Sequence, residues 1–233
     1  DPSSGDVARI FVDLGSREID SSKTFLSTFP KAKQFHIHCF EANPKFNKLY
    51  DKFHKETRGN IRLTYHNKAF GVENTTLVLS DRSVGSSIVA DGSAKKQSVE
   101  GGGGTSVGVV DAAAFFAYEV APEIAAHADS YVVMKMDIEK MEFSVLHRMA
   151  RLGLFALVDD LLLECHYNTN KPPSQRDPTK HIGLDDCKKL VQQFNTLLGG
   201  KGETSRPFVS VLWNSPKTAR SSGYGTSHGG VFP

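Results

Sequence analysis

The sequence predicts an α/β fold built on a doubly wound, mostly parallel sheet. Short apolar runs that read as strands alternate with segments whose apolar residues recur at helical spacing. One of these runs, residues 158–165, has a continuous apolar centre, which is typical of a strand buried on both faces. Polar residues follow most of the runs at their carboxyl ends, where ligands bind in folds of this class.

Six runs are expected to be strands of this sheet. Each is a short stretch rich in β-branched, aromatic or aliphatic residues and is bounded by glycine, proline or polar residues. Residues 75–81 and 86–90 alternate between apolar and polar side chains instead, which favours an antiparallel excursion. The six expected strands are residues 9–14, 35–40, 61–70, 131–137, 158–165 and 207–213.

Five helices are expected between and after these strands. Ser21 or Ser22 suits the cap of the first helix, and Pro44 suits the first turn of the second. The third is rich in alanine, and the fourth carries an apolar stripe that stops near Gly153. The expected helices are residues 21–29, 44–53, 111–126, 138–152 and 184–197.

The chain, residues 1–233, is expected to be a single domain, because no linker or internal repeat divides it. Residues 91–106 are too rich in Gly, Ser and Lys to hold a core, so a mobile loop is expected, either inert or acting as a lid. The C-terminal arm, residues 214–233, is poor in apolar residues until Val231 and Phe232 and could return as a final edge strand.

Composition limits the kinds of partner. The chain has 233 residues and a net charge of +2, and its basic residues are scattered, so no nucleic-acid partner is expected. No apolar run is long enough to span a membrane. The chain begins at Asp1 without a methionine, so a signal or anchor could have been removed, and the single sequon at Asn74 leaves cytoplasm and secretory lumen both open. The oligomeric state is open too.

The three cysteines, Cys39, Cys165 and Cys187, are expected to be buried free thiols. Their number is odd and their spacing is wide, and no CxxC pattern occurs.

Two strand ends together meet the needs of a nucleoside cofactor. Gly15 after the first strand allows close approach of backbone N–H groups to an anionic group, and Glu41 after the second can accept both hydroxyls of a ribose. In the structural alternative, Gly15 is a turn residue and Glu41 caps the following helix. The loop after Gly15 does not match G-x-G-x-x-G.

Two later strand ends carry groups suited to proton transfer or metal binding. Glu164 and His166 are two residues apart and therefore share a face if the strand continues, with Asp137 on the neighbouring strand. The three could form a general base with its orienting partner, or ligands for a divalent cation, or a hydrogen-bonded structural triad.

Nearby residues have structural readings. Lys135 could pair with a carboxylate, and Glu139 and Glu142 suit the first turn of a helix. His36 and His38 alternate with apolar neighbours and are expected to be structural.

Four blocks in order resemble the FkbM-type S-adenosylmethionine-dependent methyltransferases. They are the sequences FVDLG from Phe11, CFEANP from Cys39, KMDIEKME from Lys135 and LECH from Leu163. They span residues 11–166, which is most of the chain. The resemblance implies a Rossmann-like class I methyltransferase fold, with a seven-stranded, mostly parallel sheet and one antiparallel strand near its edge.

The resemblance also implies roles for single residues. Asp13, Gly15 and Ser16 would face the methionine part of S-adenosylmethionine, and Glu41 would bind the ribose. Lys68 and Ala69 would lie by the adenine, and Asp137 by the sulfonium and the acceptor. The family typically methylates hydroxyl groups of sugars or natural products. The chain departs from the pattern at Lys140, where the family usually has glycine, and in the bulky loop of residues 16–18.

The function expected on these grounds is methyl transfer from S-adenosylmethionine to a hydroxyl of a small-molecule or glycan acceptor. His166, oriented by Glu164, is the expected general base, and Asp137 either positions the hydroxyl or shares a divalent cation with both. One alternative is a non-catalytic binding module with a degenerate cofactor site, favoured by Arg17 and Glu18. A dinucleotide oxidoreductase is disfavoured because G-x-G-x-x-G is absent.

Overall fold

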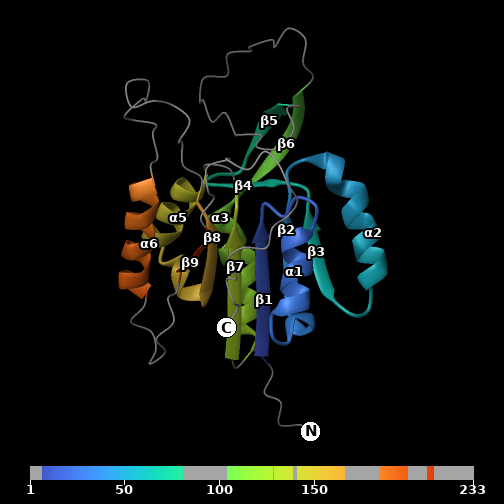
Figure 1. Cartoon of the computed structure of the whole chain (residues 1–233), viewed down its shortest axis with the longest axis horizontal. Coiled ribbons are helices and arrows are strands. Elements are labelled where there is room, and N and C mark those ends of the chain that lie inside the picture. Colours follow the sequence, from blue (N-terminus) through green and yellow to red (C-terminus); the bar gives the residue numbers. More distant parts are fainter. Residues whose placement is uncertain are drawn as a thin grey trace, which may run out of the picture.

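The computed structural model describes residues 7–80, 104–127, 129–138, 141–165, 184–198 and 209–212, and it has the expected α/β architecture. Its main sheet has six strands in the order β3-β2-β1-β7-β8-β9, and all five neighbouring pairs run parallel (Figure 1). The strands are β1 Val7–Leu14, β2 His36–Phe40, β3 Arg62–His66, β7 Asp129–Met136, β8 Asp160–Glu164 and β9 Val209–Leu212.

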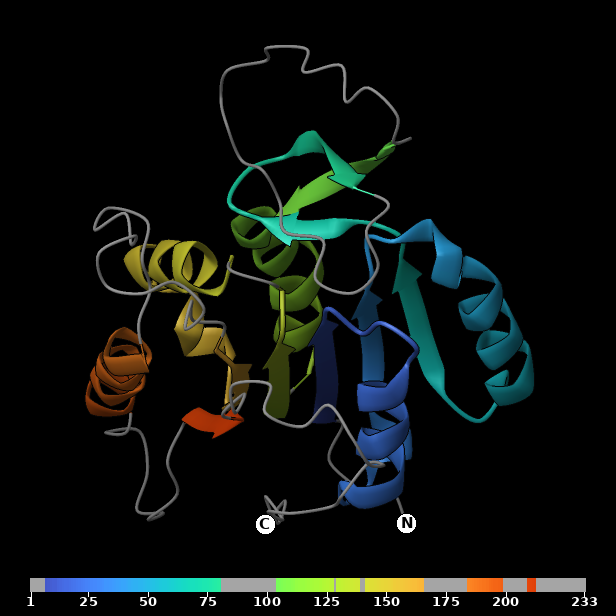
Figure 2. The same ribbon diagram turned by 45° about the horizontal axis from the view of Figure 1, so that its top comes forward.

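Helices cover both faces of this sheet, so the prediction of a doubly wound fold is confirmed (Figures 1 and 2). One continuous helical segment contains α3, a π-type turn at Phe116–Val120, and α4. Short 3-10 turns at Ala32–Gln34, Pro44–Phe46 and Leu154–Leu157 join other elements. The α-helices are α1 Asp20–Thr28, α2 Asn47–Thr57, α3 Ala112–Phe115, α4 Ala121–Ala125, α5 Glu142–Arg151 and α6 Leu184–Leu198.

The alternation of side chains along β1 creates two separate cores. Ile10 and Val12 face the layer of α3 to α6, whereas Phe11 faces α1 and α2. On the second face, Phe25 of α1 stacks on Phe11, with ring centroids 3.9 Å apart. Burying a large apolar side chain contributes roughly 1.5–3 kcal/mol, so both layers hold the sheet in place. None of the described helices is long and apolar enough to cross a membrane.

The expectation of seven strands in one sheet is wrong for the described part of the chain. Beside the six-stranded sheet lies a second sheet of three strands, in the order β4-β6-β5, with β5 and β6 antiparallel. The antiparallel pairing is therefore in the small sheet and not at the edge of the main one. These strands are β4 Ala69–Gly71, β5 Thr75–Ser80 and β6 Gly104–Asp111.

The expected strand at residues 61–70 divides because of Asn67. Its side-chain amide donates to the backbone oxygens of Glu41, at 2.9 Å, and Ala42, at 3.3 Å, and the N–H of Lys68 turns back to the oxygen of His66. The chain leaves the main sheet there, and Ala69 pairs with Val109 of β6.

The expected glycine-rich loop at residues 91–106 extends too far, because residues 104–106 belong to β6. The remainder of that loop, the possible strand at 86–90 and the C-terminal arm at 214–233 lie outside the described residues.

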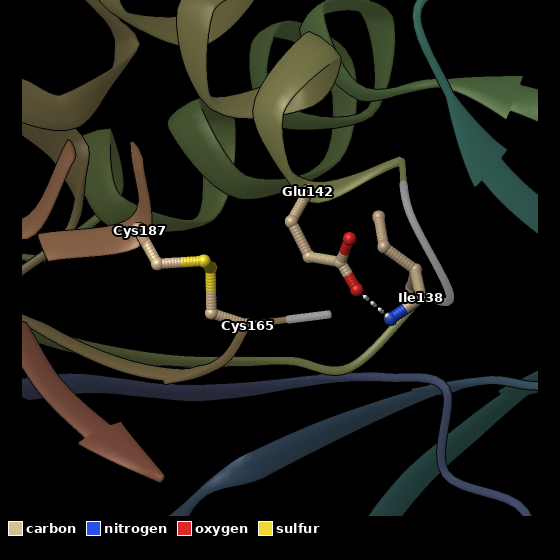
Figure 3. The surroundings of a disulfide bond; sticks show 4 residues. All are labelled: Ile138, Glu142, Cys165 and Cys187. Atoms are coloured by element: carbon tan, nitrogen blue, oxygen red, sulfur yellow. Dashed lines mark hydrogen bonds between the residues drawn. A yellow bond between two sulfur atoms is a disulfide. The ribbon is translucent and has the colours of Figure 1, made fainter. Parts of the chain in front are cut away.

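The prediction that all three cysteines are free is also wrong. Cys165, directly after β8, forms a disulfide with Cys187 of α6, and both are fully buried (Figure 3). Their separation of 22 residues fits no recognisable spacing, and only the packing of α6 beside β8 brings them together. Cys39 is the free cysteine of the described chain and is buried in β2.

Glu142 shows why one carboxylate of the third sequence block, KMDIEKME, is structural. It is the first residue of α5, it is fully buried, and its Oε1 accepts the backbone N–H of Ile138 at 3.2 Å (Figure 3). This bond joins the turn after β7 to the first residue of α5, and the helix dipole also favours an acidic residue in the first turn. Glu139 lies outside the described residues.

Candidate functional site

The order of the strands places the candidate site between β1 and β7. From β1 the chain proceeds in one direction through β2 to β3, and β7 lies on the opposite side of β1. The order is that of doubly wound dinucleotide-binding sheets, in which ligands bind at the carboxyl ends of the strands where the direction reverses. Gly15 follows β1, and Asp137 follows β7.

Parallel register brings the predicted residues to one edge. Leu14 at the end of β1 pairs with Phe40 of β2 and with Met136 of β7, and Met136 pairs with Leu163 of β8. The residues that come next, or soon after, are Gly15, Glu41, Asp137 and Glu164, so the four predicted positions share this edge.

Gly15 is required by its backbone and by its neighbour. Its φ is +78°, and a Cβ built on it would lie 1.8 Å from the backbone oxygen of Asp137. Its N–H donates to the oxygen of Phe40 at 3.0 Å, and the N–H of Ser16 donates to the same oxygen at 3.1 Å. The space beside Gly15 that was predicted to admit a ligand is thus occupied by the backbone of Asp137, just after β7. The N–H groups of Gly15 and Ser16 already donate within the protein.

A lysine and two aspartates form the charged centre of the edge. Lys135 Nζ donates to the backbone oxygen of Gly15 at 3.0 Å and to Asp137 Oδ2 at 3.2 Å, and lies 3.7 Å from Asp13 Oδ1. The expected pairing of Lys135 with a carboxylate is therefore confirmed. Two carboxylates against one ammonium leave an excess of negative charge, which favours a cationic ligand.

Asp13 is completely buried, and its two oxygens differ. Oδ2 accepts the hydroxyls of Ser21 and Ser22, each at 2.6 Å. Oδ1 accepts no hydrogen bond from the described residues and has only the longer contact with Lys135. The prediction that Ser21 or Ser22 caps α1 is wrong. Ile19 occupies the position before the helix and makes no side-chain cap.

The first loop is strained at two residues other than glycine. Arg17 has φ +40° and Ile19 has φ +66°, and Ile19 is fully buried. A β-branched residue rarely adopts this conformation, and backbone strain of about 1–3 kcal/mol per residue collects at functional sites. The hydroxyl of Ser16 is buried, accepts from Tyr50 at 2.5 Å and donates to the oxygen of Phe40 at 3.2 Å, so Ser16 anchors the loop.

Glu41 joins the first loop to the chain after β2. Its Oε2 accepts the N–H of Arg17 at 2.9 Å, and its Oε1 accepts the N–H of Asn43 at 2.7 Å. Burial raises the pKa of Glu41, and these two hydrogen bonds oppose the rise. The 3-10 turn that follows is capped by Asn43 instead. A carboxylate oxygen has two lone pairs, so each oxygen can accept a further hydroxyl.

The remaining predicted residues that the structure describes, Lys68, Ala69 and Glu164, follow or end strands at the same edge. Lys68 is exposed in the turn before β4, and Ala69 is buried at the start of β4. Glu164 is half-buried and lies two residues after Leu162 in β8, so the two share a face of the sheet. Leu162 packs against the core beside α1 and α2, and Asp13 lies on the same face of β1. His166 lies outside the described residues, so the base and the metal triad of Asp137, Glu164 and His166 stay predictions.

Three residues shape this site through contacts that sequence reasoning missed. Tyr50 fixes Ser16, Asn67 fixes the backbone after Glu41, and Ile19 supports the strained loop. The sequence places Tyr50 in the expected helix of residues 44–53. Nothing in the sequence indicates that its hydroxyl reaches a serine 34 residues earlier.

Comparison with known proteins gives one structural likeness. No family model matches the chain, and no curated protein matches it. The chain is similar to the crystal structure of methyltransferase FkbM from Methylobacillus flagellatus KT, with 16% identity and a TM-score of 0.36 over 64% of this chain. The chain spans 30% of that protein.

Proposed function

We propose that this chain is an S-adenosylmethionine-dependent methyltransferase that methylates a hydroxyl group. The observation that carries the proposal is the meeting of Gly15, Glu41 and Asp137 at the point where the strand order reverses. Three of the four ordered sequence blocks that resemble FkbM-type methyltransferases contain these same positions.

The described residues fit a cofactor that carries a sulfonium and a ribose. Asp13 and Asp137 together outweigh the charge of Lys135, and Asp13 Oδ1 is a buried oxygen without a hydrogen bond from the described chain. Glu41 retains lone pairs for ribose hydroxyls. Lys68 and Ala69 lie after β3, and we place the adenine beside them.

Methyl transfer from a sulfonium is an in-line displacement that removes a positive charge. Aligning the two reactants can lower the barrier by ~7–11 kcal/mol. Asp137 is suited to position the acceptor hydroxyl, because Lys135 holds its Oδ2 and its side chain is 20% exposed while that of Asp13 is fully buried. We assign proton removal to His166 with Glu164 as its orienting partner, and a divalent cation shared by the three is the alternative.

We propose a sugar, a glycan or a natural-product scaffold as the acceptor class, because the family that this sequence resembles methylates hydroxyl groups of such compounds. The disulfide between Cys165 and Cys187 favours an oxidising compartment, such as the secretory lumen, over the cytoplasm.

A second candidate function is a non-catalytic binding module. The N–H groups of Gly15 and Ser16 both donate to Phe40, and both oxygens of Glu41 already accept backbone N–H groups. A loop closed in this way against its own strands suits a fold that has lost the cofactor.

Thermal unfolding with S-adenosylhomocysteine separates the two candidates. A ligand at 100 times its Kd stabilises the folded state by about 2.7 kcal/mol, so the proposal predicts a clear rise in Tm. Glu41→Gln should weaken binding about tenfold or more, because it replaces a charged acceptor of the ribose hydroxyls with a neutral one.

Glu56→Gln is the matched control, since Glu56 is an exposed carboxylate on α2 whose ion pair within the described chain is with Lys52. This variant should bind like the wild type. If neither S-adenosylmethionine nor S-adenosylhomocysteine raises the Tm of the wild type, the binding module is the better description.

A further inference from the structure

We propose that His36, His38 and Glu123 form a binding site for a divalent transition-metal ion of the zinc type. His36 and His38 lie on β2, and Glu123 lies on α4, which packs over that face of the sheet. One ligand atom from each residue lies within 4.8 Å of the other two. The site is independent of the proposed methyl transfer.

The spacing of the three atoms matches a metal coordination shell. His36 Nδ1 lies 2.9 Å from Glu123 Oε2 and 3.1 Å from His38 Nε2. Two ligands held about 2.0–2.1 Å from a tetrahedral zinc ion lie about 3.3 Å apart. Small adjustments of side chains already in place would therefore complete three corners of a zinc site.

Hydrogen bonds alone satisfy this arrangement poorly. With neutral imidazoles and an ionised Glu123, a hydrogen on His36 Nδ1 must serve both the carboxylate and His38. If the hydrogen is on His38 instead, the contact between His36 and Glu123 brings two lone pairs together. A cation at the centre removes this conflict, because all three lone pairs then point at positive charge.

Each proposed ligand has a partner on its outer side, and all three partners belong to β3. Thr64 Oγ1 lies 2.8 Å from His36 Nε2, His66 Nε2 lies 3.1 Å from His38 Nδ1, and Arg62 donates to Glu123 Oε1 at 2.7 Å. Metal-binding histidines and carboxylates are typically oriented by such outer hydrogen bonds. A chance cluster of polar groups would not need a separate partner for every ligand.

The surroundings also suit a metal. The side chains of His36 and Glu123 are 8% and 13% exposed, so the pair lies near enough to the surface for an ion to enter and for water to supply a fourth ligand. Arg62 is 64% exposed, so water screens its repulsion of the ion.

The position of the site indicates a structural role. His36 and His38 lie five and three residues before Glu41 along β2, so the metal would lie about 10–16 Å from the cofactor edge along the strand. A metal bound to β2 and α4 would fasten the α3 to α4 segment to the sheet.

The test begins with Zn²⁺ titration of the wild-type chain after dialysis against a chelator. We expect one Zn²⁺ per chain, with an affinity that falls at least 100-fold in Glu123→Gln. Thr64→Val removes only an outer partner and should weaken binding about tenfold. His54→Ala is the control, because His54 is exposed on α2 and should not alter binding.

Cobalt substitution tests the site without any variant. Wild-type protein loaded with Co²⁺ should show the visible bands of a four-coordinate ion with nitrogen and oxygen ligands, and Mg²⁺ should not displace it. The proposal is wrong if the wild type takes up no stoichiometric Zn²⁺. It is also wrong if Glu123→Gln binds Zn²⁺ as tightly as the wild type, because surface histidines alone would then hold the ion.

Discussion

Gly15 is the single residue on which the geometry of the cofactor edge depends most. Alanine there would combine a left-handed backbone with a Cβ 1.8 Å from the oxygen of Asp137. Gly59 offers a matched comparison, since its φ is +85° and its Cβ would meet nothing within 4 Å. The two positions thus separate backbone strain from close contact.

We expect Gly59→Ala to lower the free energy of unfolding by about 1–2 kcal/mol and Gly15→Ala to lower it by roughly 3 kcal/mol or more. Urea denaturation of the two variants measures both values. Equal losses of unfolding free energy at the two positions would show that the backbone of Asp137 does not contact Gly15 as described.

At this scale the sequence predicted the positions better than the contacts. Gly15, Glu41 and Asp137 could be found because each follows an apolar strand, and parallel strands end at a common edge. The anchoring of Ser16 by Tyr50 could not, because a hydroxyl on a helix gives no sign of which distant serine it will reach.

Among the elements, β6, α3 and α5 are joined by one partly buried aspartate. Asp111 ends β6, its Oδ1 accepts the N–H of Ala113 at the start of α3, and both of its oxygens accept from Arg148 of α5, at 3.0 and 2.5 Å. The hydrogen bond from Arg148 is the main reason that the pKa of Asp111 is below its usual value.

This pair should make stability depend on acid. Because the folded pKa of Asp111 is lowered, its ionised form stabilises the fold above about pH 3.8, and that contribution is lost as the pH falls through the folded pKa. Asp111→Asn should therefore be less stable than the wild type at pH 6, and the difference should shrink towards pH 3. A difference in urea midpoint that does not change with pH would contradict this account.

The disulfide is the second link between elements. It closes a loop of 22 residues between the end of β8 and α6, and the loss of such a constraint costs about 3 kcal/mol. Dithiothreitol should therefore lower the Tm of the wild type. Cys165→Ala/Cys187→Ala should already be less stable and should not respond to dithiothreitol, and a response in that variant would place the effect at Cys39.

The element that the sequence predicted least well is β6, whereas β5 lies at Thr75–Ser80, within the expected antiparallel excursion, and does pair antiparallel. β6 begins at Gly104, the last glycine of a glycine-rich run, and continues with Thr105 and Ser106, so composition indicated a loop there. Backbone pairing with β4 and β5 makes this segment a strand despite its composition. The sequence did not predict this pairing because it joins segments far apart in the chain.

For the whole molecule, the alternation of strands and helices was enough to predict the doubly wound sheet. The number of strands could not be predicted in this way. The chain leaves the main sheet at Asn67 because of hydrogen bonds to Glu41 and Ala42, which lie 26 and 25 residues earlier. The strand order, with its reversal between β1 and β7, is what gives the separate sequence blocks a common location.

The central claim is that this location binds S-adenosylmethionine, and a crystal grown with S-adenosylhomocysteine tests it most directly. We predict electron density for the ligand at the carboxyl ends of β1 and β7, with its ribose hydroxyls on Glu41 and its sulfur towards Asp137. Density for the ligand elsewhere on the chain, or none at a saturating concentration, would contradict the account.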